Sequence, residues 1–162
     1  MAQKPPGSLR GSIDLICYDF DGVMTDNRAL VSATGQEWVA VNRSDGLAVS
    51  AIRKMKLPQI ILSTETDGVV SARAAKLRIP AIQGLEAKEI TLADYAKGGG
   101  YSLARTVYIG NDVNDLAAMR LVGYAIAPAD GDERVKKIAF HVTRAKGGEG
   151  VVREFYETFL RT

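Results

Sequence analysis

Two aspartates, Asp19 and Asp21, are separated by one residue where an apolar segment runs into a glycine turn. Residues 13–20 are mostly apolar, as is typical of a buried parallel strand. Side chains alternate along a strand, so both carboxylates face one side beyond its carboxyl end, where open α/β sheets bind ligands. Gly22 permits a tight turn that brings main-chain N–H groups close to an anion. This spacing suits phosphoryl transfer, although Asp-x-Asp alone is also common in surface turns and helix caps.

Two further strand-like segments end in polar side chains. Residues 59–62 lead into Ser63 and Thr64, hydroxyl residues that are equally suited to capping the helix that follows. Residues 106–109 lead into Gly-Asn-Asp-Val-Asn-Asp at 110–115, which adds two carboxylates at a third strand end. The carboxyl ends of parallel strands meet at one edge of a sheet, so these groups are expected to lie near Asp19 and Asp21.

The elements that position these residues alternate between strand-like and helix-like patterns. This order predicts an α/β fold with a doubly wound (Rossmann-like) parallel sheet. Lys88 opens one helix-like segment, residues 88–97, on which lysines are usually solvated. A chain of 162 residues is long enough for one core. We expect a flexible N-terminal tail at 1–11, rich in Lys, Pro, Gly and Ser, and a single domain at 12–162.

Charge and composition exclude several classes of partner. A net charge of +2 without a basic run gives no track for nucleic acid. No segment is apolar and long enough to span a membrane, and the start lacks a signal-peptide core. The single cysteine, Cys17, lies inside the first strand and fits a reducing cytoplasm. The only histidine, His141, is far from every motif and is assigned a structural role.

The motifs together resemble the haloacid dehalogenase superfamily of phosphatases. In order they are Asp-x-Asp-Gly-Val-x-Thr-Asp, Ser/Thr, Lys and Gly-Asn-Asp-x-x-Asp. The similarity runs over residues 14–159 and extends to the Lys-Gly-Gly-Glu-Gly-Val-Val-Arg-Glu segment at 146–154. More narrowly, the chain resembles the small capless branch that includes 3-deoxy-manno-octulosonate 8-phosphate phosphatases and the phosphatase-like domains of acylneuraminate cytidylyltransferases.

The resemblance implies a mechanism for phosphate monoesters. Asp19 corresponds to the nucleophile that forms an aspartyl phosphate, and Asp21 to the general acid and base. It also implies Mg²⁺, held by the Asp19 carboxylate, the Asp21 main-chain carbonyl and the Asp112 carboxylate. Three clustered acids would repel one another without such a cation.

The remaining motif residues are expected around the phosphate and the metal. Lys88 would offset phosphate charge and hold the nucleophile ionised, while Ser63 and Thr64 cradle phosphate oxygens. Asn111 and Asp115 are expected to surround the metal ligands without binding the metal. For Asp115 two roles are equally supported, orienting a metal-bound water or stabilising a helix start through the helix dipole.

No cap domain is expected, because the chain between Asp26 and Asp45 is too short for one. Residues 30–32 and 37–41 are instead predicted to pair as a small β-hairpin after the first strand, with Gly35 in its turn. A lone hairpin is marginal in water, and relatives are typically tetramers, so a homotetramer with a neighbouring subunit over the active site is expected. The basic residues near the glycine-rich loop are candidates for the substrate carboxylate: Arg144, Lys146 and Arg153.

Substrate choice depends on the second motif. Octulosonate phosphatases usually place Gly-Arg after the second-motif Thr, whereas this chain has Glu65-Thr66 after Thr64. This departure favours a nine-carbon nonulosonate 9-phosphate, sialic or ketodeoxynonulosonic, with the octulosonate 8-phosphate as the alternative. Glu65, paired with Lys76, would accept hydrogen bonds from the longer polyol, although both residues also suit the ends of a helix.

Two alternatives come from other classes of protein. One is a phospho-accepting receiver domain, which has no use for Asp21 as an acid and base. The other is a non-catalytic oligomerisation domain of a sugar-nucleotide synthase system, an interpretation that is weakened because every catalytic acid is present.

Overall fold

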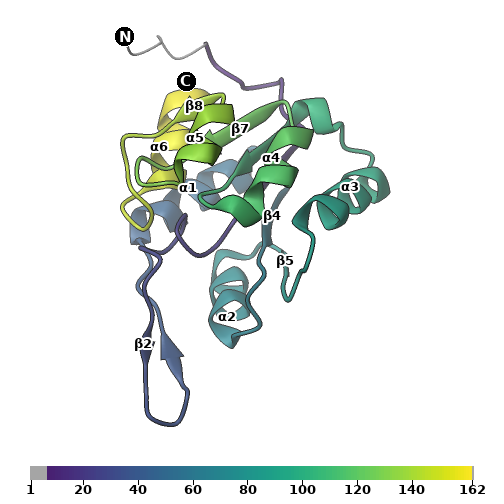
Figure 1. The fold of residues 1–162 in the computed structure, drawn as a ribbon. Coiled ribbons are helices and arrows are strands. Elements are labelled where there is room, and N and C mark those ends of the chain that lie inside the picture. The colour runs from purple at the N-terminus through teal and green to yellow at the C-terminus, as the bar shows by residue number, and fades with distance from the viewer. Residues whose placement is uncertain (1–6, 162) are drawn as a thin grey trace.

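The structure, a computed structural model, describes residues 7–161 as an α/β domain in which strands and helices alternate (Figure 1). The strands are β1 (Leu15–Tyr18), β2 (Leu30–Val31), β3 (Glu37–Trp38), β4 (Gln59–Leu62), β5 (Ala81–Ile82), β6 (Thr106–Ile109), β7 (Tyr124–Ala127) and β8 (His141–Val142). The helices are α1 (Arg43–Lys54), α2 (Gly68–Leu77), α3 (Lys88–Gly99), α4 (Leu116–Leu121), α5 (Glu133–Ile138) and α6 (Val151–Phe155). Short 3₁₀ helices cover Leu103–Arg105 and Val113–Asp115, and a π-helical turn, Tyr156–Leu160, follows α6.

Six strands of the described chain form one sheet in the order β5-β4-β1-β6-β7-β8, and all neighbours are parallel. From β1 the chain first builds outward through β4 and β5, and it then returns to the other side of β1 for β6, β7 and β8. This arrangement confirms the predicted doubly wound sheet. The carboxyl ends of β1, β4 and β6 therefore lie side by side at the point where the winding reverses, which is where such sheets bind ligands.

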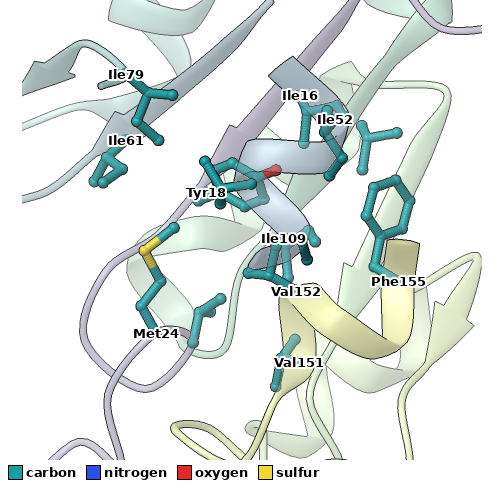
Figure 2. Close-up of a cluster of buried hydrophobic side chains, with 14 of the residues drawn as sticks. Ile16, Tyr18, Met24, Ile52, Ile61, Ile79, Ile109, Val151, Val152 and Phe155 are labelled. Carbon is teal, nitrogen blue, oxygen red and sulfur yellow. The ribbon is translucent and has the colours of Figure 1, made fainter. Parts of the chain in front are cut away.

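Alternate residues of β1 enter two hydrophobic clusters on opposite faces of the sheet. Leu15 and Cys17 pack with residues of α3, α4 and α5, whereas Ile16 and Tyr18 pack with residues of α1, α2 and α6. Figure 2 shows the second cluster, in which labelled side chains from β1, α1 and α6 are directed toward one another. The full burial of an aliphatic side chain contributes about 1.5–3 kcal/mol, so both faces anchor the central strand.

The predicted hairpin is present between β1 and α1. β2 and β3 pair antiparallel, with Leu30 opposite Trp38, and the turn contains Gly35 at φ +82°. Pairing is shorter than predicted, because it ends at Trp38 and does not extend to residue 41. The hairpin projects away from the sheet and helices (Figure 1). Residues 19–42 contain this hairpin and no larger insertion, so no cap domain is evident in the described part of the chain, as expected.

The first described residues pack on the C-terminal segment. Leu9 is buried and its main-chain N–H donates to the Phe159 carbonyl at 2.9 Å. Packing against the domain therefore begins before the predicted tail boundary at residue 11. Residues 1–6 of that tail lie outside the described residues.

His141 packs edge-on against Phe159, with ring centroids 5.0 Å apart, in line with its predicted structural role. Over residues 7–161, no helix has the length and apolarity needed to cross a membrane.

Candidate active site

The predicted site residues meet at the carboxyl ends of the three central strands. A pocket of about 230 Å³ opens there. Its lining includes residues from all three strand ends: Asp19, Asp21, Asn27, Ser63, Thr64, Glu65, Asn111, Asp112, Val113 and Asn114. The expectation that the strand ends converge is therefore met in the described structure.

A buried charge network lies beneath this pocket. Lys88, the first residue of α3, donates from Nζ to Asp19 Oδ1 at 2.7 Å and to Asp115 Oδ1 at 2.8 Å. All three side chains are almost fully inaccessible to water. Although burial disfavours its charge, the two carboxylates raise the pKa of Lys88, so the ammonium keeps its proton. Burial and the charge of Asp115 raise the pKa of Asp19, and Lys88 opposes this rise.

Asp115 is held by more partners than its sequence context indicates. Its Oδ1 also accepts from the buried Tyr108 hydroxyl at 2.7 Å. Its Oδ2 accepts from the main-chain N–H groups of Asn111 at 2.9 Å and Asp112 at 3.2 Å. Asp115 thus lies at the start of a helical segment and also fixes the lysine that contacts Asp19, while its predicted role toward a metal-bound water stays a prediction.

The turn after β1 presents Asp21 to the pocket. Its Oδ1 accepts from the Thr25 hydroxyl at 3.2 Å, and Thr25 Oγ1 in turn accepts from Gly22 N at 3.2 Å. Burial raises the pKa of Asp21, with the Thr25 hydrogen bond opposing it. A half-buried carboxyl that lines the pocket beside Asp19 is placed to give and take a proton there.

Gly22 has two reasons to be glycine. Its φ is +82°, in the left-handed region that disfavours a side chain. A Cβ there would also lie 1.9 Å from Asn111 Nδ2, so the missing side chain makes room for the Asn111 amide.

The glycine-rich loop before α6 packs directly on the same turn. Gly148 N donates to the Val23 carbonyl at 3.1 Å, and a Cβ on Gly147 would lie 2.2 Å from the Gly22 carbonyl oxygen. Asn42, the N-cap of α1, donates from Nδ2 to the Gly148 carbonyl at 3.2 Å. The glycine-rich loop therefore supports the turn after β1 within its own chain.

The oxygen atoms beside the turn suit a hard cation. Over the described residues, no three Asp, Glu, His or Cys side chains form a metal cluster. The available donors are instead one carboxylate, Asp19 Oδ2, one main-chain carbonyl, Asp21 O, and the adjacent amide of Asn111. Oxygen-only donors are those that Mg²⁺ prefers, so this set fits the implied metal.

The side chains of Asn111 and Asp112 point in different directions. Asn111 is buried, and the nearest atom of its amide lies 2.8 Å from Asp19 Oδ2 and 2.9 Å from Asp21 O. The Asp112 carboxylate accepts from Val113 N at 2.7 Å and is exposed on the pocket wall, and its role as the third metal donor stays a prediction. The physical reason is Asp115, whose hold on both main-chain N–H groups turns one side chain inward and the next outward.

The second-motif residues take different positions. Ser63 is buried at the end of β4, where its Oγ accepts from Glu65 N at 3.1 Å, and Thr64 is partly exposed on the pocket wall. Glu65 is exposed and lines the same pocket. Lys76 is exposed in the last turn of α2 and is not among the residues lining this pocket, so the structure shows no Glu65–Lys76 pair there.

A second hollow continues from the first toward the hairpin. It measures about 180 Å³ and shares Asp21, Asn27 and Glu65 with the first. Its other charged lining residues are Arg28, Glu37 and Asp67. Together the two hollows fall within the usual range for small-molecule sites, about 300–1,000 Å³. Carboxylates outnumber the single arginine, so the lining suits hydroxyl groups better than a second anion.

Sequence reasoning missed four contributors to this site. Thr25 was interpreted only as part of a motif, yet it joins Asp21 to the main chain of the turn. Tyr108 is a polar residue in an otherwise apolar strand, a signal for the buried hydroxyl that contacts Asp115. Arg28 and Asn27 follow the first motif without any pattern that marks them as lining residues.

Comparisons with known proteins agree with this geometry. A sequence profile of haloacid dehalogenase-like hydrolases matches residues 83–155. The 3-deoxy-D-manno-octulosonate 8-phosphate phosphatase of Haemophilus influenzae is 30% identical over 93% of this chain and 84% of its own length.

Solved structures give the same result. A Streptomyces avermitilis protein described as a haloacid dehalogenase family hydrolase is 41% identical, with a TM-score of 0.92 over 97% of this chain and 89% of that one. The 3-deoxy-D-manno-octulosonate 8-phosphate phosphatase of Moraxella catarrhalis, in complex with magnesium ion, phosphate ion and the octulosonate, is 30% identical. Its TM-score is 0.87, over 91% of this chain and 88% of that one.

Proposed function

This chain belongs to the haloacid dehalogenase-like hydrolases, in the branch of the 3-deoxy-D-manno-octulosonate 8-phosphate phosphatases, and we propose that it hydrolyses 3-deoxy-D-manno-octulosonate 8-phosphate. As a member of this branch it is a Mg²⁺-dependent phosphoric monoester hydrolase. The single observation that carries the proposal is the buried contact of Lys88 with Asp19, beside Asp21 at the end of β1.

We assign the chemical roles as follows. The Asp19 carboxylate attacks phosphorus in line, while the bond from phosphorus to the sugar oxygen breaks and Asp21 gives its proton to that oxygen. Asp21 then takes a proton from water, whose oxygen attacks the aspartyl phosphate, releases phosphate and restores the Asp19 carboxylate. Bound Mg²⁺, held by Asp19 and the Asp21 carbonyl, would supply positive charge that offsets the phosphate and the nucleophile.

The other site residues act on binding and position. Lys88 offsets charge on Asp19 and the phosphate, and Ser63 and Thr64 provide hydroxyls at the phosphate end of the pocket. Asp115 keeps Lys88 in place. We propose these roles for the single domain at 12–162, to which the described residues before it also attach through Leu9.

Two features bear on the choice of sugar. Two of the proteins compared above are named as phosphatases of the eight-carbon ester, so they favour the alternative over the predicted nine-carbon substrate. Lys76 does not line the pocket with Glu65, so the predicted pair adds no support for the longer polyol. The acidic lining next to Asp21 suits sugar hydroxyls. We expect basic residues elsewhere to bind the substrate carboxylate, and Arg144 and Lys146 are exposed near the glycine-rich loop.

Side-by-side kinetics test this proposal. With Mg²⁺, we expect kcat/KM for the eight-carbon 8-phosphate to exceed that for nine-carbon 9-phosphates by at least about tenfold. This is the discrimination expected when one part of a substrate does not fit its contacts in the pocket. Chelation of the metal with EDTA should stop phosphate release from both. A preference for the nine-carbon ester would restore the nonulosonate assignment. Release of no phosphate from either ester would favour the non-catalytic oligomerisation domain.

We also propose that the hairpin joins four copies of the chain. Leu30 is 74% exposed and its partner Trp38 is 48% exposed, so the hairpin carries apolar surface that a monomer leaves in water. This surface borders Asp26 and Arg28, close to the hollow beside Asp21, so a neighbouring copy would wall the substrate site.

Disruption of the hairpin surface tests the assembly. Leu30→Glu should convert a tetramer into smaller species in light scattering and lower kcat/KM, because a charge cannot be buried between copies. Ile90→Glu is the matched control, since Ile90 is 61% exposed on α3, a different element. A wild-type monomer, or equal effects of the two substitutions, would contradict a hairpin-mediated tetramer.

A further inference from the structure

The first turn of α1 holds the glycine-rich loop at two points. Asn42, the N-cap, donates from Nδ2 to the Gly148 carbonyl at 3.2 Å. Asp45 Oδ1 accepts from the main-chain N–H of Arg153 at 2.9 Å. The two contacts lie at the loop itself and at the start of α6, so one turn of α1 fixes the segment 148–153.

The same loop is packed against the turn after β1 without any free space. Gly148 N donates to the Val23 carbonyl at 3.1 Å. A Cβ on Gly148 would lie 2.6 Å from Asp26 N, and a Cβ on Gly147 would lie 2.2 Å from the Gly22 carbonyl oxygen. Because main-chain atoms meet main-chain atoms here, a displacement of the loop displaces the turn as well.

That turn alone sets the direction of the Asp21 carboxylate. Asp21 Oδ1 accepts from the Thr25 hydroxyl, and Thr25 Oγ1 accepts from Gly22 N, each at 3.2 Å. All three residues belong to the turn. The contacts therefore run from α1 through the glycine-rich loop and the turn to the proposed general acid.

Core packing does not explain why residue 45 is acidic. Asp45 is 2% exposed, and among the described residues its Oδ2 and the nearby Arg73 Nε are buried without hydrogen-bond partners. Such a buried carboxylate costs stability. Burial raises the pKa of Asp45 to about 6, and the hydrogen bond from Arg153 N and the charge of Arg73 oppose this rise. The contact with Arg153 N is what the side chain provides in return.

Resting on the proposed phosphatase function, we propose that Asn42 and Asp45 are positioning residues for Asp21. They hold the glycine-rich loop against the turn after β1, and the turn then directs the Asp21 carboxyl at the oxygen of the leaving group. Their loss slows the step in which Asp21 gives its proton to that oxygen, while binding of the phosphate group is retained.

Two esters with different leaving groups isolate this step. The sugar oxygen of the eight-carbon 8-phosphate needs a proton to depart, whereas p-nitrophenolate is a weak base and departs without one. The ratio kcat/KM covers the steps up to departure of the leaving group. A defect in the direction of Asp21 therefore lowers kcat/KM for the sugar ester and spares p-nitrophenyl phosphate.

The variants remove one contact at a time in the full-length protein, assayed with Mg²⁺ at pH 8. Asn42→Asp keeps an oxygen for Ser44 N, which caps α1 at 2.8 Å, but has no N–H for the Gly148 carbonyl. Asp45→Ala removes the acceptor of Arg153 N, and Asp45→Asn keeps an oxygen there.

We expect Asn42→Asp and Asp45→Ala to lower kcat/KM for the sugar ester by at least about tenfold, the scale of a misplaced catalytic group. Asp45→Asn should stay within about threefold of wild type. Each variant should stay within about threefold for p-nitrophenyl phosphate. Added to Asp21→Asn, Asn42→Asp should cause no further loss beyond about threefold, because the residue through which it acts is already gone.

Ile52→Ala is the matched control for lost stability. Ile52 is a buried residue of α1 in the cluster of Figure 2. Its truncation leaves a cavity and should lower the melting temperature at least as much as Asp45→Ala does. It should change kcat/KM for the two esters by the same factor, because it removes neither contact with the loop.

The outcomes separate this inference from the function. Wild type that hydrolyses both esters, with variants that lower both equally or lower neither, would overturn the inference and leave the phosphatase proposal intact. Wild type that does not hydrolyse the sugar ester would overturn the proposed function and the inference with it. Loss confined to the sugar ester, with retention of activity in Asp45→Asn, supports the positioning role.

Discussion

Asp19→Asn is expected to abolish phosphate release, with kcat reduced by about 10⁴-fold or more, the scale of removing a covalent nucleophile. Asparagine keeps the shape of the side chain but replaces the attacking carboxylate by a neutral amide. The neighbouring contacts persist in part, since Lys88 keeps its 2.8 Å contact with Asp115. The loss is therefore expected in chemistry and not in folding. Phosphate release and melting temperature, measured on the same preparation, check both statements.

Asp14→Asn provides the matched control for this loss. Asp14 is a partly exposed surface residue whose Oδ1 accepts from Arg105 Nε at 2.8 Å, and it is not among the residues lining the active-site pocket. The same chemical change there should leave kcat within about twofold, as is usual for surface substitutions. Substantial turnover by Asp19→Asn, with Asp14→Asn unchanged, would rule out Asp19 as the nucleophile.

Lys88→Met is expected to have the largest effect on stability. Methionine has a similar length but no charge, so the buried carboxylates of Asp19 and Asp115 lose their shared cation. Removing one partner of a buried ion pair typically costs about 3–5 kcal/mol. Without metal at pH 8, urea unfolding should show a loss of that size. Phosphate release should fall as well, because the nucleophile and phosphate lose the same charge.

The stability loss of Lys88→Met should depend on pH in a stated direction. Burial and Asp115 raise the pKa of Asp19, and removing Lys88 removes an opposing effect. An acid with a raised pKa in the folded state binds more protons there than in the unfolded chain, so stability falls as pH rises between the two pKa values. The loss should therefore be smaller at pH 5 than at pH 8.

Lys97→Met is the control on the same helix. Lys97 lies in the last turn of α3 and is exposed, so its replacement should change stability by about 0.5 kcal/mol or less at either pH. An equally small effect of Lys88→Met, or a loss that does not change between pH 5 and pH 8, would show that Lys88 does not compensate the buried charges of Asp19 and Asp115.

The fold was predictable because its strongest signals are local. The apolar segments at 59–62 and 106–109 coincide with β4 and β6. Each segment is followed by polar residues, which are unfavourable in the interior of a buried sheet. Parallel strands bring such ends to one edge, so the order of residues alone groups Asp19, Ser63 and Asp115. The hairpin followed from the short distance to the next motif, although its strands are shorter than the pattern indicated.

The parts that could not be predicted depend on contacts between distant segments. Asn111 and Asp112 are neighbours with similar side chains, and only the hydrogen bonds to Asp115 decide which of them enters the site. The burial of Leu9 depends on a hydrogen bond to Phe159, at the other end of the chain. Neither contact leaves a periodic pattern in the sequence.

The most direct test of the central claim is to look for phosphate on Asp19 during turnover. Wild type is mixed with Mg²⁺ and the eight-carbon 8-phosphate, quenched in acid within one turnover, digested and analysed by mass spectrometry. We expect one phosphoryl group on the peptide that contains Asp19, and none when Asp19 is asparagine. Turnover with an unmodified peptide, or a phosphoryl group on another residue, would contradict hydrolysis through an Asp19 phosphate.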